Sequence, residues 1–187
     1  MKPHFSNNDL DMFYKYLNKS KNYFEFGSGG STYQASLINN IQNIISIESD
    51  KEWYDLLIKN IKDKSKLNNI LIDLESDKNN WGYPSQKCPK HKYKLYSDQI
   101  LNTSLNIDLI LIDGRFRVAC ALKSYNIIDD NCIIIFDDFL NRPWYHVVLD
   151  YFEIIEKTDD KRMVILKKIP NKIIPYDLIL NYENEPK

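Results

Sequence analysis

Short apolar runs alternate along this chain with longer stretches in which apolar residues recur every three or four positions. Runs bounded by polar residues are typical of buried strands, and the wider spacing is typical of helices that bury one face. The strands predicted in this way cover residues 23–26, 44–47, 69–74, 108–112, 132–136, 152–157 and 162–169. The predicted helices lie within residues 1–20, 32–39, 50–61, 115–127 and 142–151.

Strands and helices alternate five times, and the last two strands flank a turn at Asp159-Asp160. This order predicts an α/β fold, with a mostly parallel sheet, helices on both faces and a closing antiparallel hairpin. A length of 187 residues suits one domain over residues 1–187. Residues 75–98 are predicted to form a long irregular loop, and residues 170–187 a loosely held tail.

The most informative motif joins the first predicted strand to the helix after it. Residues 23–32 read YFEFGSGGST, in which Glu25 lies at the end of the strand, a glycine turn follows, and hydroxyl residues open the helix. Glycines let the backbone approach a ligand closely, and the start of a helix offers free N–H groups. A second acid, Glu48, follows the next strand. Loop, helix and acid together are typical of the nucleoside-binding half of an α/β sheet.

The pattern E-x-G-x-G-G-S resembles motif I of class I S-adenosylmethionine (SAM) methyltransferases. A dinucleotide fold would have a third glycine where Thr32 stands, and an acid at position 25 suits a cationic ligand better than a pyrophosphate. The resemblance extends over residues 23–169 and implies a Rossmann-like, seven-stranded sheet in the order 3-2-1-4-5-7-6, with strand seven antiparallel. The candidate SAM-binding residues are Glu25, Gly27, Ser28, Gly29, Ser31, Glu48, Asp73, Trp81 and Asp113.

Among these candidates, Glu48 is expected to accept hydrogen bonds from the ribose hydroxyls, although an acid there also caps a helix. Asp73 is expected to contact the adenosine, and Asp77 competes for that role. Trp81, with Tyr83, would form a wall against the adenine or a sugar ring. The alternative for this aromatic pair is a small satellite core.

Acids also follow the fourth and fifth predicted strands, as Asp113 and as the pair Asp137-Asp138. The carboxyl ends of parallel strands meet at one edge of the sheet, and Mg²⁺ prefers oxygen ligands. The arrangement resembles metal-dependent O-methyltransferases, including those that act on sugar hydroxyls. This resemblance implies a metal site at Asp113, Asp137 and Asp138 that eases deprotonation of the acceptor. The alternative is that Asp137-Asp138 only ends a strand and caps a turn.

Further candidates surround these acids. His146 is the candidate general base, unless it is a surface histidine, and Asp113 is the second candidate catalytic residue. Arg115 and Arg117 are candidates for binding a phosphate or carboxylate of the substrate, or else for pairing with the strand-end acids. Tyr83 and Tyr145 complete the substrate-binding candidates. Tyr145 belongs to a run, residues 145–148, that resembles little-characterised methyltransferase-like proteins.

Composition narrows the class of partner. The net charge of −1 provides no basic field for nucleic acid, and no Asn/Asp-Pro-Pro-Tyr/Phe motif follows the fourth strand, so nucleic acid is an unlikely substrate. Three scattered cysteines, no apolar leader and no apolar run of about 18 residues predict a cytoplasmic protein with no membrane segment.

The sequence therefore predicts a SAM-dependent O-methyltransferase that forms S-adenosylhomocysteine (SAH). Its expected acceptor is a small molecule or glycan, through a hydroxyl of a sugar, nucleotide sugar or glycan, with Mg²⁺ assisting. A homodimer could complete the acceptor site, because the chain has little beyond the core fold. Two alternatives stay open: a nicotinamide-dependent oxidoreductase, which would bind a dinucleotide, and a non-catalytic SAM-fold binding module, which would show no turnover.

Overall fold

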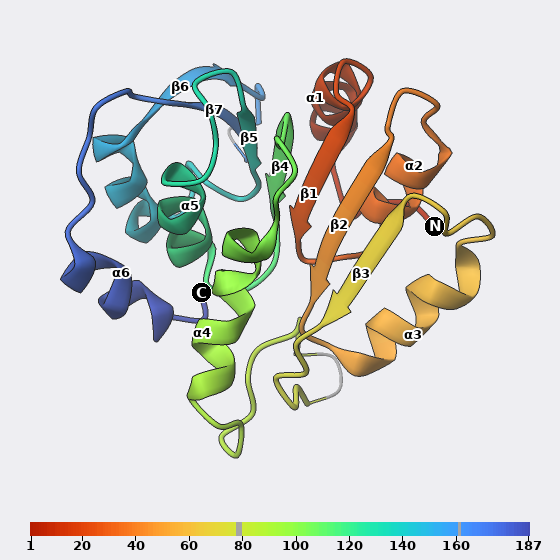
Figure 1. The fold of residues 1–187 in the computed structure, drawn as a ribbon, viewed down its shortest axis with the longest axis horizontal. Helices are drawn as coiled ribbons and strands as arrows, with labels where there is room; N and C mark the ends of the chain where they lie inside the picture. The colour runs from red at the N-terminus through yellow and green to blue at the C-terminus, as the bar shows by residue number, and fades with distance from the viewer. Residues whose placement is uncertain (78–79, 161) are drawn as a thin grey trace.

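One seven-stranded sheet forms the centre of the molecule, in the order β3-β2-β1-β4-β5-β7-β6 (Figure 1). The computed structural model describes residues 1–77, 80–160 and 162–187. Strand β7 runs antiparallel to both of its neighbours, and β1 to β5 are parallel to one another. The strands are β1 Asn22–Phe26, β2 Asn43–Glu48, β3 Leu67–Leu71, β4 Leu109–Ile112, β5 Ile133–Phe136, β6 Phe152–Lys157 and β7 Val164–Lys168. The predicted sheet order and the antiparallel β7 are confirmed.

Helices cover both faces of this sheet. The α-helices are α1 Asn7–Leu17, α2 Gly30–Leu37, α3 Lys51–Asn60, α4 His91–Asp98, α5 Arg117–Tyr125 and α6 Tyr176–Glu183, and the 3-10 helices are η1 Gln99–Asn102 and η2 Pro143–Asp150. Helices α1 and α2 pack on one face, and α4, α5 and α6 pack with η1 and η2 on the other. The side chains of β1 alternate accordingly: Tyr23 lies among the residues of the first core, and Phe24 and Phe26 lie in the second.

Four segments differ from the sequence-based expectation. The predicted helix over residues 142–151 is the 3-10 helix η2, and β3 begins and ends earlier than residues 69–74 because it pairs residue by residue with β2. The predicted irregular loop contains α4, which buries Tyr96 completely against Phe26 and Phe116. The predicted tail contains α6, which packs against α5 and α4.

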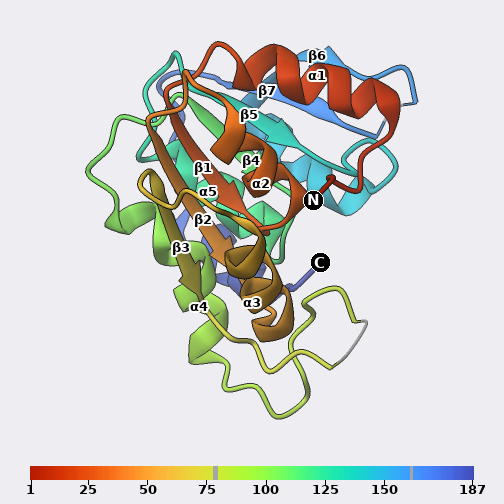
Figure 2. The same ribbon diagram turned by 90° about the vertical axis from the view of Figure 1, so that its right-hand side faces the viewer.

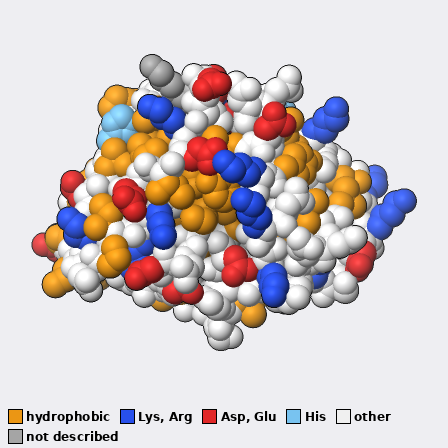
Figure 3. All heavy atoms as spheres, turned by 90° about the horizontal axis from the view of Figure 1, so that it is seen from above, with side chains coloured by type: hydrophobic (Ala, Val, Ile, Leu, Met, Phe, Trp, Pro, Cys, Tyr) orange, Lys and Arg blue, Asp and Glu red, His pale blue; other side chains and the backbone are white. Residues whose placement is uncertain are grey.

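The carboxyl ends of β1 to β3 point to the lower end of the molecule in Figures 1 and 2, where residues 72–77 and 80–90 lie beyond the sheet. The opposite face, seen in Figure 3, carries Lys or Arg and Asp or Glu side chains interspersed around a central group of hydrophobic side chains. Within residues 1–77, 80–160 and 162–187, no helix is long and apolar enough to cross a membrane.

Candidate functional site

The glycine turn after β1 lies directly against the turn after β4. Gly27 has a φ of +95°, and its N–H donates to the carbonyl of Ile47 at 2.9 Å. A Cβ on Gly27 would stand 2.6 Å from the backbone of Gly114, which is closer than two such atoms can approach. Both the backbone conformation and the contact therefore require glycine here. The strand-end turns of β1 and β4 thus form a shared floor for a ligand.

Glu25 lies beneath this turn and supports it. The alternation along β1 directs its side chain toward α2, where the hydroxyls of Ser31 and Thr32 donate to its two oxygens and Ser46 on β2 adds a third contact at 3.2 Å. The side chain is fully buried. Glu25 was predicted to contact SAM, and the structure instead places it among hydroxyl donors below the surface of the loop.

Burial raises the pKa of Glu25 to about 7, against the lowering effect of the Ser31 and Thr32 hydroxyls. A folded-state pKa above the unfolded value stabilises the protein below about pH 4.5, and this contribution is lost as the pH rises through about 7. Glu25→Gln keeps the shape and stays neutral. We expect the variant to be more stable than the wild type at pH 8 by up to about 3 kcal/mol, since one pKa unit corresponds to about 1.4 kcal/mol.

Urea unfolding at pH 5 and at pH 8 measures this difference, which should fall to about 1 kcal/mol at pH 5. Glu153→Gln, at an exposed position on β6, is the matched control and should change little at either pH. A Glu25→Gln protein that is less stable than the wild type at pH 8 would show that the hydroxyl donors hold the carboxylate ionised.

Glu48 ends β2 at the same carboxyl edge. Its side chain accepts hydrogen bonds from the Ser28 hydroxyl at 2.9 Å and from the backbone N–H groups of Ser49 and Asp50 at 2.7 and 2.8 Å. Burial raises its pKa to about 7, although these donors favour the ionised form. Glu48 is therefore tied to the glycine turn through Ser28. Trp53 on α3 fixes the turn further, because its indole N–H donates to the Ser28 carbonyl at 2.7 Å and its ring covers Gly29.

The N-terminal segment lies across the start of α2. A Cβ on Gly30 would meet the backbone of Lys2 at 2.2 Å, and Gln34 donates to the carbonyl of Met1 at 2.8 Å. The His4 ring contacts the ring of Trp81 edge-on, with centroids 5.9 Å apart. Trp81 itself is 74% exposed. Trp81, a candidate SAM-binding residue, therefore lies beside the N-terminal segment. No sequence motif indicated this contact.

The other candidates on the β3 side lie in the segment that precedes α4. Asp73 is half-buried and accepts the backbone N–H of Glu75 at 2.8 Å, so it closes a turn just after β3. Gly82 packs so closely on Ser49 that a Cβ would stand 2.4 Å from its hydroxyl. The next residue, Tyr83, stacks with the guanidinium of Arg115 at 4.2 Å from the ring centroid. The segment therefore reaches across from the end of β2 to the end of β4.

The acids after β4 and β5 do come together, but arginines accompany them. Asp113 pairs with Arg117 at 3.1 Å. Asp138 pairs with Arg142 at 2.6 Å and with Arg162 at 3.0 Å, and Arg162 also reaches Asp137 at 3.4 Å. Opposite charges at these distances compensate one another. The guanidinium groups thus occupy the place that a cation would take among the carboxylates.

The predicted Mg²⁺ site at Asp113, Asp137 and Asp138 is consequently not supported. A hard cation needs several free carboxylate oxygens around it, and here guanidinium groups pair with Asp113 Oδ1, Asp137 Oδ2 and both oxygens of Asp138. Across the described ranges 1–77, 80–160 and 162–187, no group of three or more His, Cys, Asp or Glu side chains is arranged to hold a metal ion. Three arginines compensate the charges of these acids, and no sequence motif indicated two of them, Arg142 and Arg162.

Arg117 was a candidate either for substrate binding or for pairing with the strand-end acids, and the structure shows the pairing, with Asp113. It is 3% exposed and donates from Nε to the carbonyl of Gly114, from Nη1 to the carbonyl of Asp137 and from Nη2 to the carbonyl of Asp113. These bonds measure 3.0, 2.7 and 2.9 Å. One side chain thereby joins the turn after β4 to the turn after β5.

The pKa values of Asp113 and Asp137 are both raised. Burial is the first cause for each; Arg117 opposes it at Asp113, and the Asp113 charge adds to it at Asp137. Neighbouring carboxyl groups that are buried together favour holding a proton between them. Asp113 is the more accessible, with 29% of its side chain exposed. A raised pKa makes the ionised Asp113 a stronger base than an ordinary aspartate, at the turn that touches Gly27.

The second candidate base, His146, lies on η2. Its Nε2 is 3.3 Å from the carbonyl of Phe139, and its ring lies against the Phe139 ring with centroids 5.2 Å apart. A carbonyl only accepts, so this contact requires a proton on Nε2 and leaves Nδ1 with its lone pair in the neutral ring. The side chain is half-buried. His146 is thus oriented as a possible proton acceptor on the β5 side of the edge.

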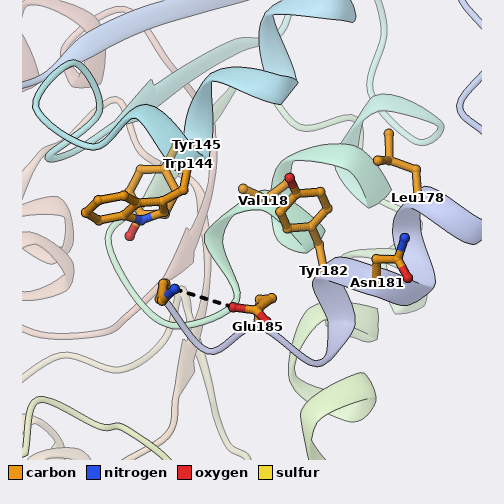
Figure 4. A pocket seen from close by; sticks show the side chains of 8 residues that line it. Val118, Trp144, Tyr145, Leu178, Asn181, Tyr182 and Glu185 are labelled. Carbon is orange, nitrogen blue, oxygen red and sulfur yellow. Dashed lines mark ion pairs between the residues drawn. The ribbon is translucent and has the colours of Figure 1, made fainter.

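A groove of about 510 Å³ opens where α5 and η2 begin (Figure 4). Trp144 and Tyr145 from η2 form one wall, and Val118 from α5 and Tyr182 from α6 form the other. Tyr145 is almost completely buried and was predicted to bind substrate. Sugar rings stack well on aromatic walls of this kind. Trp144 and Tyr182 were missed by sequence reasoning, because only the position of α6 brings them together.

Comparison with solved structures identifies the fold. A methyltransferase-like protein of Silicibacter pomeroyi superposes with a TM-score of 0.85 at 24% identity, covering 99% of this chain and 98% of the other. A Staphylococcus aureus protein provisionally named a caffeoyl-CoA O-methyltransferase gives 0.61 at 14% identity, covering 90% and 86%. A Streptococcus pneumoniae protein provisionally named a tRNA (m1A22) methyltransferase gives 0.56 at 12% identity, covering 93% and 75%.

The fold is therefore that of the class I SAM-dependent methyltransferases, as the sequence predicted. Neither protein-family models nor curated proteins match the sequence.

Proposed function

We propose that this protein is a SAM-dependent O-methyltransferase that methylates a hydroxyl of a sugar, nucleotide sugar or glycan. The observation that carries the proposal is the contact between the turn after β1 and the turn after β4, beside Glu48. Gly27 and Gly114 meet so closely that no side chain fits between them, and Ser28 links this floor to Glu48. A floor of backbone with an adjacent acid fits a nucleoside ligand.

The residues that would hold SAM come from three strand ends. The backbone N–H groups of Ser28, Gly30 and Ser31 would face its methionine part, since those of Gly27 and Gly29 donate within the protein. The Glu48 carboxylate would accept the ribose hydroxyls. Asp73 and Trp81 would border the adenosine. When bound, SAM supplies an activated methyl group that an acceptor oxygen takes by direct displacement. The protein contributes positioning and placement of charge, with no covalent intermediate.

Proton removal from the acceptor hydroxyl would be the task of Asp113 or His146. Asp113 stands at the turn that contacts Gly27, and its raised pKa makes its carboxylate a stronger base than an ordinary aspartate. His146 would use Nδ1, since the Phe139 carbonyl fixes the proton on Nε2. The groove between Trp144 and Tyr182 would receive the acceptor ring. No metal step belongs to the proposal, because Arg117, Arg142 and Arg162 already compensate the acids.

Glu48→Ala tests the cofactor assignment directly. The variant removes the predicted ribose contacts, and each charge-assisted hydrogen bond is worth about 1.5–3 kcal/mol, so SAH affinity should fall roughly 100-fold or more. Isothermal titration with SAH measures this loss, and circular dichroism checks that the variant is folded. Glu153→Ala, at an exposed position on β6, is the matched control and should bind like the wild type.

The same titrations separate the rival functions. Saturable binding of NADH in place of SAH would indicate an oxidoreductase, and SAH binding without turnover on any sugar, nucleotide sugar or glycan would indicate a binding module. Methyl transfer measured with EDTA should equal that without it. If EDTA abolished methyl transfer and Mg²⁺ restored it, the reaction would depend on a metal ion.

A further inference from the structure

Arg115, at the end of the turn after β4, is a buried cation with no ion pair in the part of the chain that the structure describes. Its side chain is 6% exposed, and its Nε has no hydrogen-bond partner. No side-chain hydrogen bond or ion pair of Arg115 is found in residues 1–77, 80–160 and 162–187; its contacts are the stack on Tyr83 and backbone bonds with Tyr96 and Cys120. Burying a guanidinium in this way is costly.

The neighbouring charges do not relieve that cost. Arg117, Arg142 and Arg162 pair with the acids Asp113, Asp137 and Asp138. Arg115 forms no ion pair within residues 1–77, 80–160 and 162–187: the Asp113 charge acts on it only at longer range, and the neighbouring Arg117 is a like charge. Burial first, and then Arg117, lowers the pKa of Arg115 from its ordinary value. A guanidinium stays charged at neutral pH, so Arg115 is a buried positive charge with no ion pair in the described ranges.

The surroundings hold Arg115 in place without neutralising it. Tyr83 stacks on its guanidinium plane, and its backbone N–H faces the Tyr96 hydroxyl at 3.5 Å. Stacking leaves the edge of the guanidinium, which carries the N–H donors, available to an oxyanion. The residue is two positions from Asp113 and next to Gly114, which contacts Gly27. The cation therefore belongs to the same floor on which the ligand is proposed to lie.

We propose that Arg115 binds an anionic group, a carboxylate or a phosphate, of a ligand in this site. The ligand's anion would form the ion pair that Arg115 lacks in the described part of the chain. The guanidinium N–H donors match the geometry of a carboxylate or a phosphate. This inference rests on the proposed function for the location of the ligand. The anion has two possible sources: the carboxylate of the methionine part of SAM, or a phosphate or carboxylate carried by the acceptor.

The first experiment compares SAH with 5′-deoxy-5′-methylthioadenosine, which lacks the amino acid carboxylate, in the wild type and in Arg115→Met. If the cofactor is the source, SAH affinity falls roughly 10- to 100-fold in the variant while that of methylthioadenosine is unchanged. If the acceptor is the source, both affinities persist, and pyrophosphate added to the SAH-saturated protein raises the unfolding midpoint of the wild type only. Chloride at equal ionic strength corrects for salt.

Two further measurements keep the inference open to failure. Arg115→Met should unfold at the same temperature as the wild type or higher, since it removes an uncompensated buried charge, and Arg115→Lys should retain part of the anion response. Lys19→Met, which removes one exposed cation on the surface, should change neither binding nor stability. A marked loss of stability in Arg115→Met, with unchanged responses to SAH and pyrophosphate, would show a purely structural arginine.

These experiments distinguish failure of the anion site from failure of the proposed function. A wild type that fails to bind SAH but responds to pyrophosphate, with the response lost in Arg115→Met, would overturn the proposed function and support the anion site. A wild type that binds SAH with no effect of Arg115→Met on either ligand would leave the function in place and overturn the anion site.

Discussion

Replacing Lys123 by methionine is expected to lower the free energy of unfolding by about 3–5 kcal/mol. The Lys123 ammonium is 4% exposed and donates to Ser97 at 2.8 Å, to Asp98 at 2.6 Å and to Glu183 at 2.5 Å. It thereby joins α4, α5 and α6 at one point. Methionine has a similar length but no charge. Asp98 and Glu183 then keep the exposed Lys94 ammonium, at 2.9 and 3.5 Å, but lose the buried one.

Chemical denaturation at pH 7 measures the loss. Lys15→Met is the matched control, because Lys15 pairs with Glu156 at an exposed site, 47% and 31% exposed respectively, where a pair contributes at most about 1 kcal/mol. The double variant Lys123→Met with Glu183→Gln should recover part of the loss. Equal effects of Lys123→Met and Lys15→Met would mean that α6 is held by apolar packing alone.

Arg117→Lys is expected to be the most damaging conservative substitution at the site. Lysine keeps the charge but loses the fork, so at least two of the three buried carbonyls that Arg117 now serves lose their donor. Each unsatisfied buried group costs about 1–3 kcal/mol, so the free energy of unfolding should fall by roughly 2–4 kcal/mol. The turns after β4 and β5 would also lose their link, and a shift of about 1 Å in such turns can slow a reaction about 100-fold.

Denaturation and single-turnover methyl transfer, once an acceptor is known, separate the two effects. Arg142→Lys provides the comparison, since Arg142 is 29% exposed and binds Asp138 from outside, and its effect on stability should stay below about 1 kcal/mol. Wild-type stability in Arg117→Lys would show that the carbonyls find other donors, and that the fork does not hold the two turns together.

The two strand-end turns also carry backbone strain. Phe116 and Asp138 have φ values of +54° and +55°, in the left-handed region that residues other than glycine rarely adopt. Both follow a strand at the carboxyl edge, where Arg117 joins the turns. Conformations of this kind persist where the surrounding contacts over-determine them, and they concentrate at functional sites. This supports placing the ligand between β1 and β4.

Sequence patterns determined the sheet because the relevant information is local. An apolar run such as residues 109–112 becomes a central strand wherever it can be covered on both faces, and alternation with helices limits the order of strands. The glycine turn was predictable for the same reason, since a φ of +95° at Gly27 is a property of one residue. Glu48 at the end of β2 followed from the length of that strand.

Only the tertiary structure decided how the charges are used. Arg117 and Arg142 each lie four residues after the acid they pair with, so those pairs are local, and pairing of Arg117 with the strand-end acids was one of the alternatives. Asp137 and Arg162 are far apart in sequence, and nothing local indicates that they meet. Helices α4 and α6 form where the sequence has weak periodicity, because Tyr96 and Glu183 find partners on distant elements. Whether a charged residue forms an ion pair depends on which groups the fold brings within a few ångströms of it. The order of residues along the chain does not give these distances.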